Sequence, residues 1–150
     1  MKWVTRENAK VDRVACPWLI SRFIDQDPEF LFVPREQVLE VARREGAHSF
    51  DAEGAEFGHR DGKCTFETLI EEHHLNDAAL LRLAFIVHGA DIPQDPSIRK
   101  RRWWRAPASE AAGLLAISDG MAKVCLDDHR KLQLLFPVYD ALYAYCQGPS

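Results

Sequence analysis

The sequence predicts an α+β fold, with a small N-terminal β-α-β portion and a hairpin followed by a mainly helical second half. Short apolar runs rich in β-branched and aromatic residues occur within the first 51 residues, which favours strands there. Asp61-Gly62 is a strong two-residue hairpin signal, because a type I′ turn needs positive φ at both central positions. From about residue 65 onward, apolar residues recur at helical spacing.

Length and composition indicate a globular protein. A chain of 150 residues can bury a core without disulfides, so we expect a single domain over residues 1–150. The net charge of −4 gives no overall attraction to nucleic acid or to an anionic membrane. The first residues lack the apolar run of a signal peptide, and no stretch approaches the roughly 20 apolar residues of a membrane span. We therefore expect a cytoplasmic protein with reduced thiols and no membrane partner.

The first third of the chain reads as alternating strands and helices. We expect a strand at 3–5, a helix at about 17–25, a strand at 29–33, a helix at 35–45 and a strand at 48–51. Pro17 fits the first turn of its helix, where a missing N–H costs nothing. Gly46 fits the C-terminal cap of the next. This order makes parallel pairing of the three strands plausible.

The second half reads as four helices. They are expected at 65–76 with Thr65 as cap, at 78–89 with Asp77 as cap and Gly89 as end, at 110–118, and after Asp127 or Asp128. Pro137 lies inside the last pattern, so a kink or a break is expected there. Between these helices, residues 92–108 form an irregular, basic, Trp-containing loop.

The hairpin supplies a candidate metal site. If Asp61-Gly62 forms the turn, His59 lies directly opposite Cys64, and the two side chains share one face of the hairpin. Asp51 would complete a mixed oxygen, nitrogen and sulfur set acceptable to a transition metal, either zinc or iron. The alternative is an ordinary hairpin with a half-buried cysteine and a surface histidine.

Cys16 is a second candidate, for catalysis or for anion binding. It precedes Pro17, so the expected helix start would place its thiol beside free N–H groups and the positive end of the helix dipole. Arg13 is close in sequence and would add positive charge for an anion. A buried, inert cysteine at a helix start is the alternative.

The loop at 92–108 offers a candidate surface for a partner. Its basic and aromatic residues could contact an acidic partner or a nucleic acid through charge and stacking. The residues concerned are Arg99, Arg101, Arg102, Trp103 and Trp104. The alternative is a solvated loop whose tryptophans pack on the body of the protein or on another subunit, and a homo-oligomer is left open.

Several blocks of the sequence resemble one known family. They are 11–25 with 29–34, Phe57-Gly58-His59-Arg60 with Cys64-Thr65-Phe66, 86–91, 110–118 and 139–143. Together they are similar to the chromate-resistance protein family, the ChrB C-terminal domain, over nearly the whole chain. The departure is the segment from Pro93 to Arg105, because most members carry a shorter link there without a basic, Trp-rich run.

The resemblance implies a role in bacterial chromate resistance, either by sensing the oxyanion or by limiting its effect. Longer members of the family carry an N-terminal helix-turn-helix-like region with a regulatory role. The sequence begins at Met1 without such a region, so we expect no binding of nucleic acid unless a further domain is present. The family does not settle whether the domain is catalytic.

Three functional hypotheses follow from the sequence. The leading one is a chromate-response domain that binds a metal ion through His59, Cys64 and Asp51, or a small oxyanion through Arg13 and Cys16. The second is a redox enzyme that depends on the Cys16 thiol or on a metal. The third is a regulatory module that binds nucleic acid through the basic loop.

Overall fold

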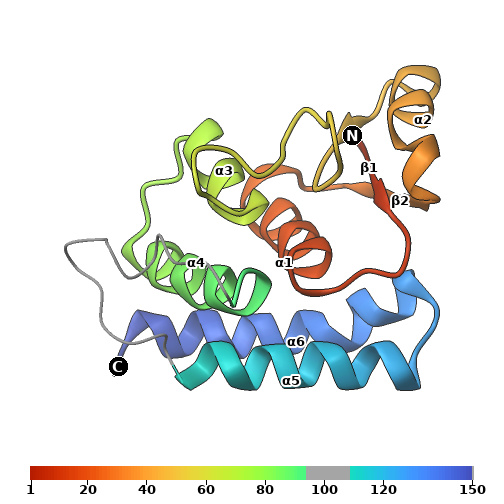
Figure 1. The fold of residues 1–150 in the computed structure, drawn as a ribbon. Helices are drawn as coiled ribbons and strands as arrows, with labels where there is room; N and C mark the ends of the chain where they lie inside the picture. The colour runs from red at the N-terminus through yellow and green to blue at the C-terminus, as the bar shows by residue number, and fades with distance from the viewer. Residues whose placement is uncertain (94–108, 150) are drawn as a thin grey trace.

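The computed structural model describes residues 1–93 and 109–149. It has the α+β arrangement that the sequence predicts, with a small sheet at one end and helices making up most of the rest of the described chain (Figure 1). Helices α5 (Ser109–Val124) and α6 (Asp128–Gln147) are both drawn along the lower side of the molecule in Figure 1. Helix α1 (Val11–Leu19) packs on α6, and α4 (Ala78–Asp91) packs on both α5 and α6.

The sheet is parallel, as the element order predicts. Strand β1 (Lys2–Arg6) lies in the centre, between β2 (Glu29–Val33) and β3 (His48–Ser49). The 3₁₀ turn η2 (Arg35–Gln37) and helix α2 (Val38–Glu45) connect β2 to β3, and Gly46 ends α2 with a φ of +62°. That left-handed cap is the one predicted from the glycine.

The predicted start of the first helix at Pro17 is wrong. Helix α1 begins at Val11 and continues into a π-helical turn, η1 (Ile20–Ile24), so Pro17 lies inside it. The reason is packing: Val11, Val14, Ala15 and Trp18 form a buried i, i+3, i+4, i+7 stripe that begins well before the proline. Burial of this stripe outweighs the hydrogen bond that Pro17 cannot donate.

The hairpin turn forms where predicted. Asp61 and Gly62 have φ values of +53° and +75°, and Arg60 and Lys63 exchange both backbone hydrogen bonds, at 3.2 and 2.9 Å. Helix α3 (Thr65–Glu72) follows directly, with Cys64 rather than Thr65 as its N-cap, and it ends before the predicted 76.

Helix α4 runs two residues past its predicted end. Asp77 caps its start by accepting the N–H groups of Ala79 and Leu80. Gly89 does not end the helix: a Cβ there would lie 2.9 Å from the Cβ of Ala111, so the glycine allows α4 and α5 to approach closely. The extra residues place Asp91 at the C-terminal end of α4.

The last two helices, α5 and α6, are both long and are joined by a short link. Helix α5 is longer than the predicted 110–118, and α6 begins after the Asp127 cap and continues through Pro137, so of the predicted kink or break the break does not occur. The carboxylate of Asp128 accepts the N–H groups of Asn8 and Ala9, at 2.9 and 2.7 Å, which ties α6 to the segment before α1. Within 1–93 and 109–149, none of the helices has the length and apolar character needed to cross a membrane.

Candidate metal site

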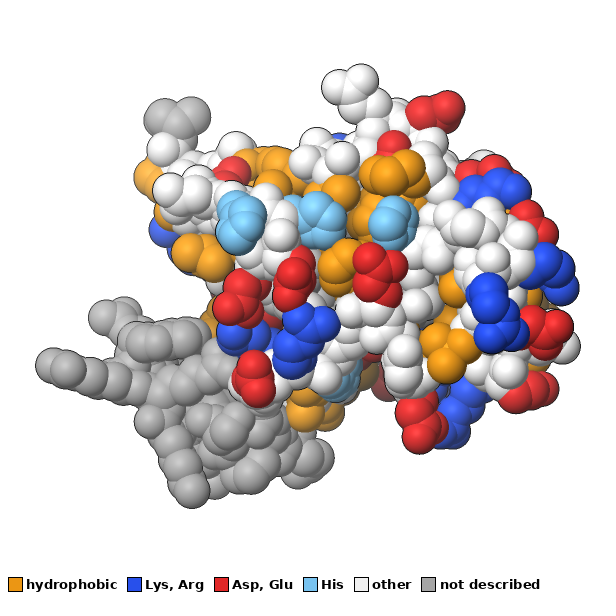
Figure 2. Space-filling model, turned by 90° about the horizontal axis from the view of Figure 1, so that it is seen from above, with side chains coloured by type: hydrophobic (Ala, Val, Ile, Leu, Met, Phe, Trp, Pro, Cys, Tyr) orange, Lys and Arg blue, Asp and Glu red, His pale blue; other side chains and the backbone are white. Residues whose placement is uncertain are grey.

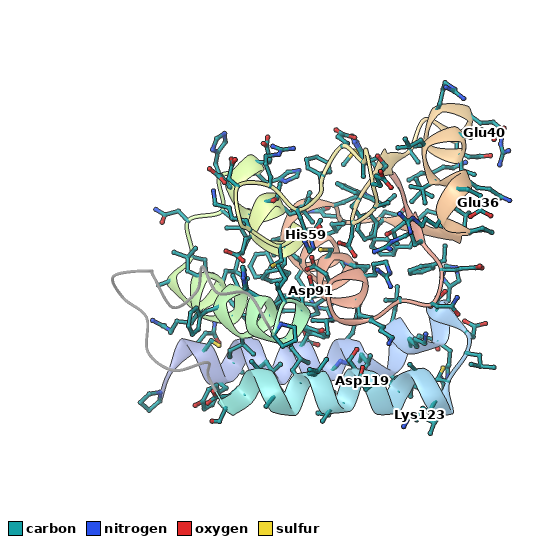
Figure 3. The ribbon with its side chains drawn as sticks, in the orientation of Figure 1. Glu36, Glu40, His59, Asp91, Asp119 and Lys123 are labelled. Carbon is teal, nitrogen blue, oxygen red and sulfur yellow. The ribbon has the colours of Figure 1, made fainter. Side chains whose placement is uncertain are left out.

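His59 lies at the centre of a group of carboxylates. Its Nε2 atom is 3.1 Å from Asp91 Oδ2, 3.4 Å from Asp51 Oδ1 and 3.5 Å from Asp12 Oδ2. Figure 3 shows His59 and Asp91 close together, where the loop before the hairpin passes the end of α4. The His59 side chain is 48% exposed and that of Asp12 is fully buried, so the group reaches from solvent into the core.

Asp12 is held by two helices. It lies in the first turn of α1, and its carboxylate accepts the N–H groups of Thr65 and Phe66 at the start of α3, at 2.7 and 3.1 Å. A carboxylate at a helix N-terminus satisfies donors that have no partner within the helix and interacts well with the helix dipole. Asp12 therefore fixes the start of α3 against α1.

Asp51 is held by the loop that follows β3. Its backbone has a φ of +47°, a left-handed conformation that aspartate tolerates better than most residues. Its carboxylate accepts hydrogen bonds from the Thr65 hydroxyl at 2.9 Å and from Arg13 Nη1 at 3.2 Å, and Arg6 lies 3.8 Å away. Burial raises the pKa of Asp51, but the bonds to His59, Arg13 and Thr65 outweigh it, so the pKa is lowered.

The remaining charges of this group are strongly perturbed. Burial raises the pKa of Asp12 to about 7, against the opposing hydrogen bond from His59. Hydrogen bonds to Asp12, Asp51 and Asp91 raise the pKa of His59 to about 12. Without a cation, His59 is therefore an imidazolium at neutral pH, and it cannot serve there as a general base.

The spacing of these ligand atoms suits a metal ion. The ligand atoms of Asp12, His59 and Asp91 all lie within 4.8 Å of one another. With metal–ligand bonds of about 2.1 Å, neighbouring nitrogen and oxygen ligands lie roughly 3.0–3.4 Å apart. The contact of His59 with Asp91, at 3.1 Å, lies within that range, and the contact with Asp12, at 3.5 Å, lies just beyond it. We call Asp12, His59 and Asp91 the His59 cluster.

A second group of ligand atoms lies between the start of α3 and the last turn of α4. Among the residues that the structure describes, Cys64, Glu67 and His88 also bring their ligand atoms within 4.8 Å of one another. Cys64 Sγ lies 3.3 Å from Glu67 Oε1, and the same carboxylate oxygen is hydrogen-bonded to His88 Nδ1. The pKa of the Cys64 thiol is raised well above its ordinary value, mainly by burial and further by the charges of Asp12 and Glu67. We call these three residues the Cys64 cluster.

The structure separates the two halves of the predicted hairpin site. His59 Nε2 lies 3.4 Å from Asp51 Oδ1, whereas Cys64 belongs to the other cluster. The two partners of His59 that the sequence analysis did not assign are Asp12 and Asp91. The helical stripe that begins at Val11 would have placed Asp12 in the first turn of a helix. Asp91 directly follows Gly89-Ala90, and extending the helix past Gly89 would have placed it at the helix end.

Cys16 is placed differently from its prediction. Because α1 begins at Val11, Cys16 lies inside the helix and not at its N-terminus, so the argument for a thiolate stabilised by free N–H groups is wrong. The thiol is fully buried and donates to Asp12 Oδ1 at 3.5 Å. Burial and the charges of Asp12 and Asp51 raise the pKa of Cys16 well above its ordinary value. Arg13, the other predicted anion ligand, pairs with Asp51.

A small cavity adjoins the exposed side of His59. It has a volume of about 390 Å³, and its charged lining includes His59, Arg6, Arg35 and Arg60. Each of these arginines pairs with a carboxylate: Arg6 with Asp51, Arg35 with Glu53 and Arg60 with Glu72. The cavity is therefore close to balanced in charge.

The predicted partner-binding residues Arg99, Arg101, Arg102, Trp103 and Trp104 lie outside the described residues. On the face drawn in Figure 2, the described acidic and basic side chains are interspersed. That face therefore gives no support, from its described residues, to an extended basic surface for nucleic acid.

Comparison with known proteins gives two matches. A family described as "ChrB, C-terminal domain" matches residues 3–146. Protein ChrB of Cupriavidus metallidurans is 34% identical over 149 residues, which are 99% of this chain and 41% of that relative. No solved structure matches the chain significantly. Both the family match and the relative extend over the elements that carry the two clusters, and the chain therefore belongs to the ChrB C-terminal domain family.

Proposed function

We propose that this chain is a metal-binding domain of the bacterial chromate response that holds one divalent cation at the His59 cluster. A single observation carries the proposal. Three carboxylate oxygens lie within 3.5 Å of one imidazole nitrogen, which can donate only one proton. A cation in place of that proton would satisfy several of these oxygens at once.

The balance of charge supports a cation. Arg13 and Arg6 lie against Asp51, which leaves Asp12 and Asp91 to share the single charge of His59. When a divalent ion displaces the His59 proton, the ion and the two carboxylates sum to zero. In a site where Asp12 is fully buried, a neutral total costs less than a residual negative charge.

The donor set favours a transition metal over calcium or magnesium. One imidazole and two carboxylates resemble the mixed nitrogen and oxygen sets that bind zinc, iron(II) or manganese(II). The exposed side of His59 leaves room for water or for a small ligand to complete the coordination. Zinc or iron, the metals expected from the sequence, both remain compatible with this set.

Direct binding of an oxyanion by the arginines is the weaker alternative. Each arginine that lines the 390 Å³ cavity already pairs with a carboxylate, so the cavity offers little net positive charge. A redox role for the Cys16 thiol also has less support, because that thiol is buried and its pKa is raised. In the proposed function, an oxyanion would meet the domain through the bound metal.

The proposal is tested by titrating the purified chain with Mn²⁺. Binding is measured in electron paramagnetic resonance as the loss of the signal of free Mn²⁺. Mn²⁺ prefers oxygen ligands, so it reports on the His59 cluster and not on a thiol. We expect one ion per chain, with an affinity reduced about 100-fold in Asp91→Asn, because one ligand is lost.

Asp119→Asn is the matched control, because Asp119 is an exposed helical aspartate whose Oδ1 atom lies 4.0 Å from Lys10 Nζ. Its affinity should equal that of the wild type. Equal Mn²⁺ affinity in the wild type and in Asp91→Asn, or no binding in either, would overturn the proposed function.

A further inference from the structure

We propose that the Cys64 cluster is a second cation site, separate from the His59 cluster, and that it takes a thiophilic divalent ion such as Zn²⁺ or Co²⁺. The inference goes beyond the function proposed above, since it concerns different residues and a different class of metal. It begins with the convergence of one sulfur, one oxygen and one nitrogen ligand from Cys64, Glu67 and His88.

Local structure brings the ligand atoms of these three side chains close together. Cys64 is the N-cap of α3 and Glu67 is its third residue, and the pair forms a capping box: the Glu67 carboxylate accepts the Cys64 N–H at 3.3 Å. That bond turns Glu67 back toward the start of α3, where its Oε1 atom lies 3.3 Å from Cys64 Sγ. The Glu67 side chain is therefore held in this position by its hydrogen bond to the start of α3.

His88 arrives from a second helix. It lies in the last turn of α4, is only 2% exposed, and contacts Glu67 Oε1 through Nδ1. The neighbouring Gly89 lets α4 approach α5 closely, so the end of α4 is fixed in place by packing. Two rigid helices thus present the three ligands, which is the usual way of holding a metal geometry precisely enough.

The spacing and the type of these ligands suit a soft metal. With a metal–sulfur bond of about 2.3 Å and a metal–oxygen bond of about 2.1 Å, sulfur and oxygen ligands lie roughly 3.1–3.6 Å apart. The observed 3.3 Å between Cys64 Sγ and Glu67 Oε1 is within that range. A set with one cysteine and one histidine favours zinc and cobalt over magnesium, calcium or manganese.

A cavity adjoins this cluster. Glu67 and His88 line a cavity of about 1420 Å³, whose described lining comes mainly from α3, α4 and the end of α6. Two of the three ligands, Glu67 and His88, therefore face this cavity, and a metal held by three protein ligands there would have a further coordination position, as in zinc sites that bind water or substrate. The lining is otherwise largely apolar, with Ile70, Leu75 and Phe85 among its members.

The charge also balances at this site. On binding, the Cys64 S–H bond breaks, a sulfur–metal bond forms, and the proton leaves to solvent. One thiolate, one carboxylate and a neutral imidazole then surround a divalent ion, and the sum is zero. Both Cys64 and His88 are buried, so a neutral site is the form that this surrounding accepts most readily.

The structural alternative is that Glu67 caps α3 and pairs with His88 without any bound metal ion. Titration of the full chain with Co²⁺ under reducing conditions separates the two, because a cobalt–thiolate bond gives a charge-transfer absorption band in the near ultraviolet. We expect this band in the wild type and its loss in Cys64→Ser. Serine is a good N-cap, so this variant keeps the start of α3 intact.

Two control variants locate the band. Cys125→Ser removes another buried cysteine, whose Sγ lies 3.5 Å from the backbone oxygen of Asp127, and should leave the band unchanged. Asp91→Asn removes a ligand of the His59 cluster and should also leave it unchanged. No band in the wild type, or a band that persists in Cys64→Ser, would overturn the second site. Loss of the band in Asp91→Asn would overturn its independence from the His59 cluster.

Discussion

The two clusters both involve the start of α3, yet they differ in almost every property that selects a ligand. The His59 cluster is rich in oxygen and partly exposed, and its charges come from three separate segments. The Cys64 cluster contains sulfur, is largely buried, and is built from two packed helices. The same few residues of α3 hold both, since Asp12 accepts the N–H groups of Thr65 and Phe66 while Cys64 caps the helix.

This difference shows how one helix N-terminus can serve two kinds of chemistry. The N–H groups of Thr65 and Phe66 at the start of α3 bind the Asp12 carboxylate, whereas the Cys64 thiol contacts Glu67. A change that moves the helix start should therefore affect both clusters, whereas a change in one ligand should affect only its own.

The largest effect is expected from Asp12→Ala. The change leaves the N–H groups of Thr65 and Phe66 without their partner in a buried site, which should lower the free energy of unfolding by about 2–3 kcal/mol. It should also weaken binding at both clusters, because the start of α3 loses its anchor. Urea denaturation of the metal-free protein measures the first effect, and Mn²⁺ and Co²⁺ titrations measure the second.

Asp119→Ala is the control for this change, and it should alter the free energy of unfolding by less than about 0.5 kcal/mol. If Asp12→Ala behaved like Asp119→Ala in urea, the idea that Asp12 anchors α3 would fail. Loss of Mn²⁺ binding with an unchanged Co²⁺ band would show that the two clusters do not depend on a common helix start.

The next effect is a dependence of Mn²⁺ binding on pH. In the metal-free protein the pKa of His59 is raised to about 12, so His59 must lose a proton to bind the ion at neutral pH. The affinity should therefore rise with pH, by about tenfold per unit between pH 7 and 9. Below pH 7 the rise should be steeper, because Asp12, with a pKa of about 7, also has to lose a proton.

Competition titrations with a chelator of known pH dependence would measure this slope. A flat affinity between pH 7 and 9 would show that no proton is displaced, and would contradict His59 as a ligand. Asp119→Asn should give the same slope as the wild type.

The smallest effect is expected from Arg13→Gln. Arg13 pairs with Asp51, and Asp51 in turn contacts His59. The Arg13 guanidinium is therefore connected to the His59 cluster through one intervening residue. Its removal should tighten Mn²⁺ binding a few-fold, because a positive charge near the bound cation is lost. Arg44→Gln is the control, since Arg44 pairs with Glu45 on α2. Weaker binding in Arg13→Gln would instead mean that Arg13 is needed to hold Asp51 in place.

Local signals predicted much of the fold from the sequence. The strand and helix order led to the parallel sheet, Asp61-Gly62 led to the hairpin, and the predicted caps included Asp77 and, as one of two candidates, Asp127. Each of these features depends on residues a few positions apart. The sequence carries such information directly, because turn and cap geometry need particular residue types.

The site was predicted only in part, because it depends on where helices begin and end. Proline at position 17 suggested a helix start, but the buried stripe from Val11 overrides it and moves Cys16 into the helix interior. Gly89 suggested a helix end, but it serves the contact with Ala111. Asp12 and Asp91 meet His59 only because both helices extend beyond those local signals.

The bonds between the segment before α1 and helix α6 have a consequence for the order of folding. Asp128 and Asn8 are 120 residues apart in the chain, and Tyr139 donates to the backbone oxygen of Val11 across 128 residues. The strand pairings, in contrast, are all complete within the first 49 residues. Closing the longer loops costs about 1 kcal/mol more in chain entropy. During refolding, amides of β1 should therefore become protected before α6 docks on α1.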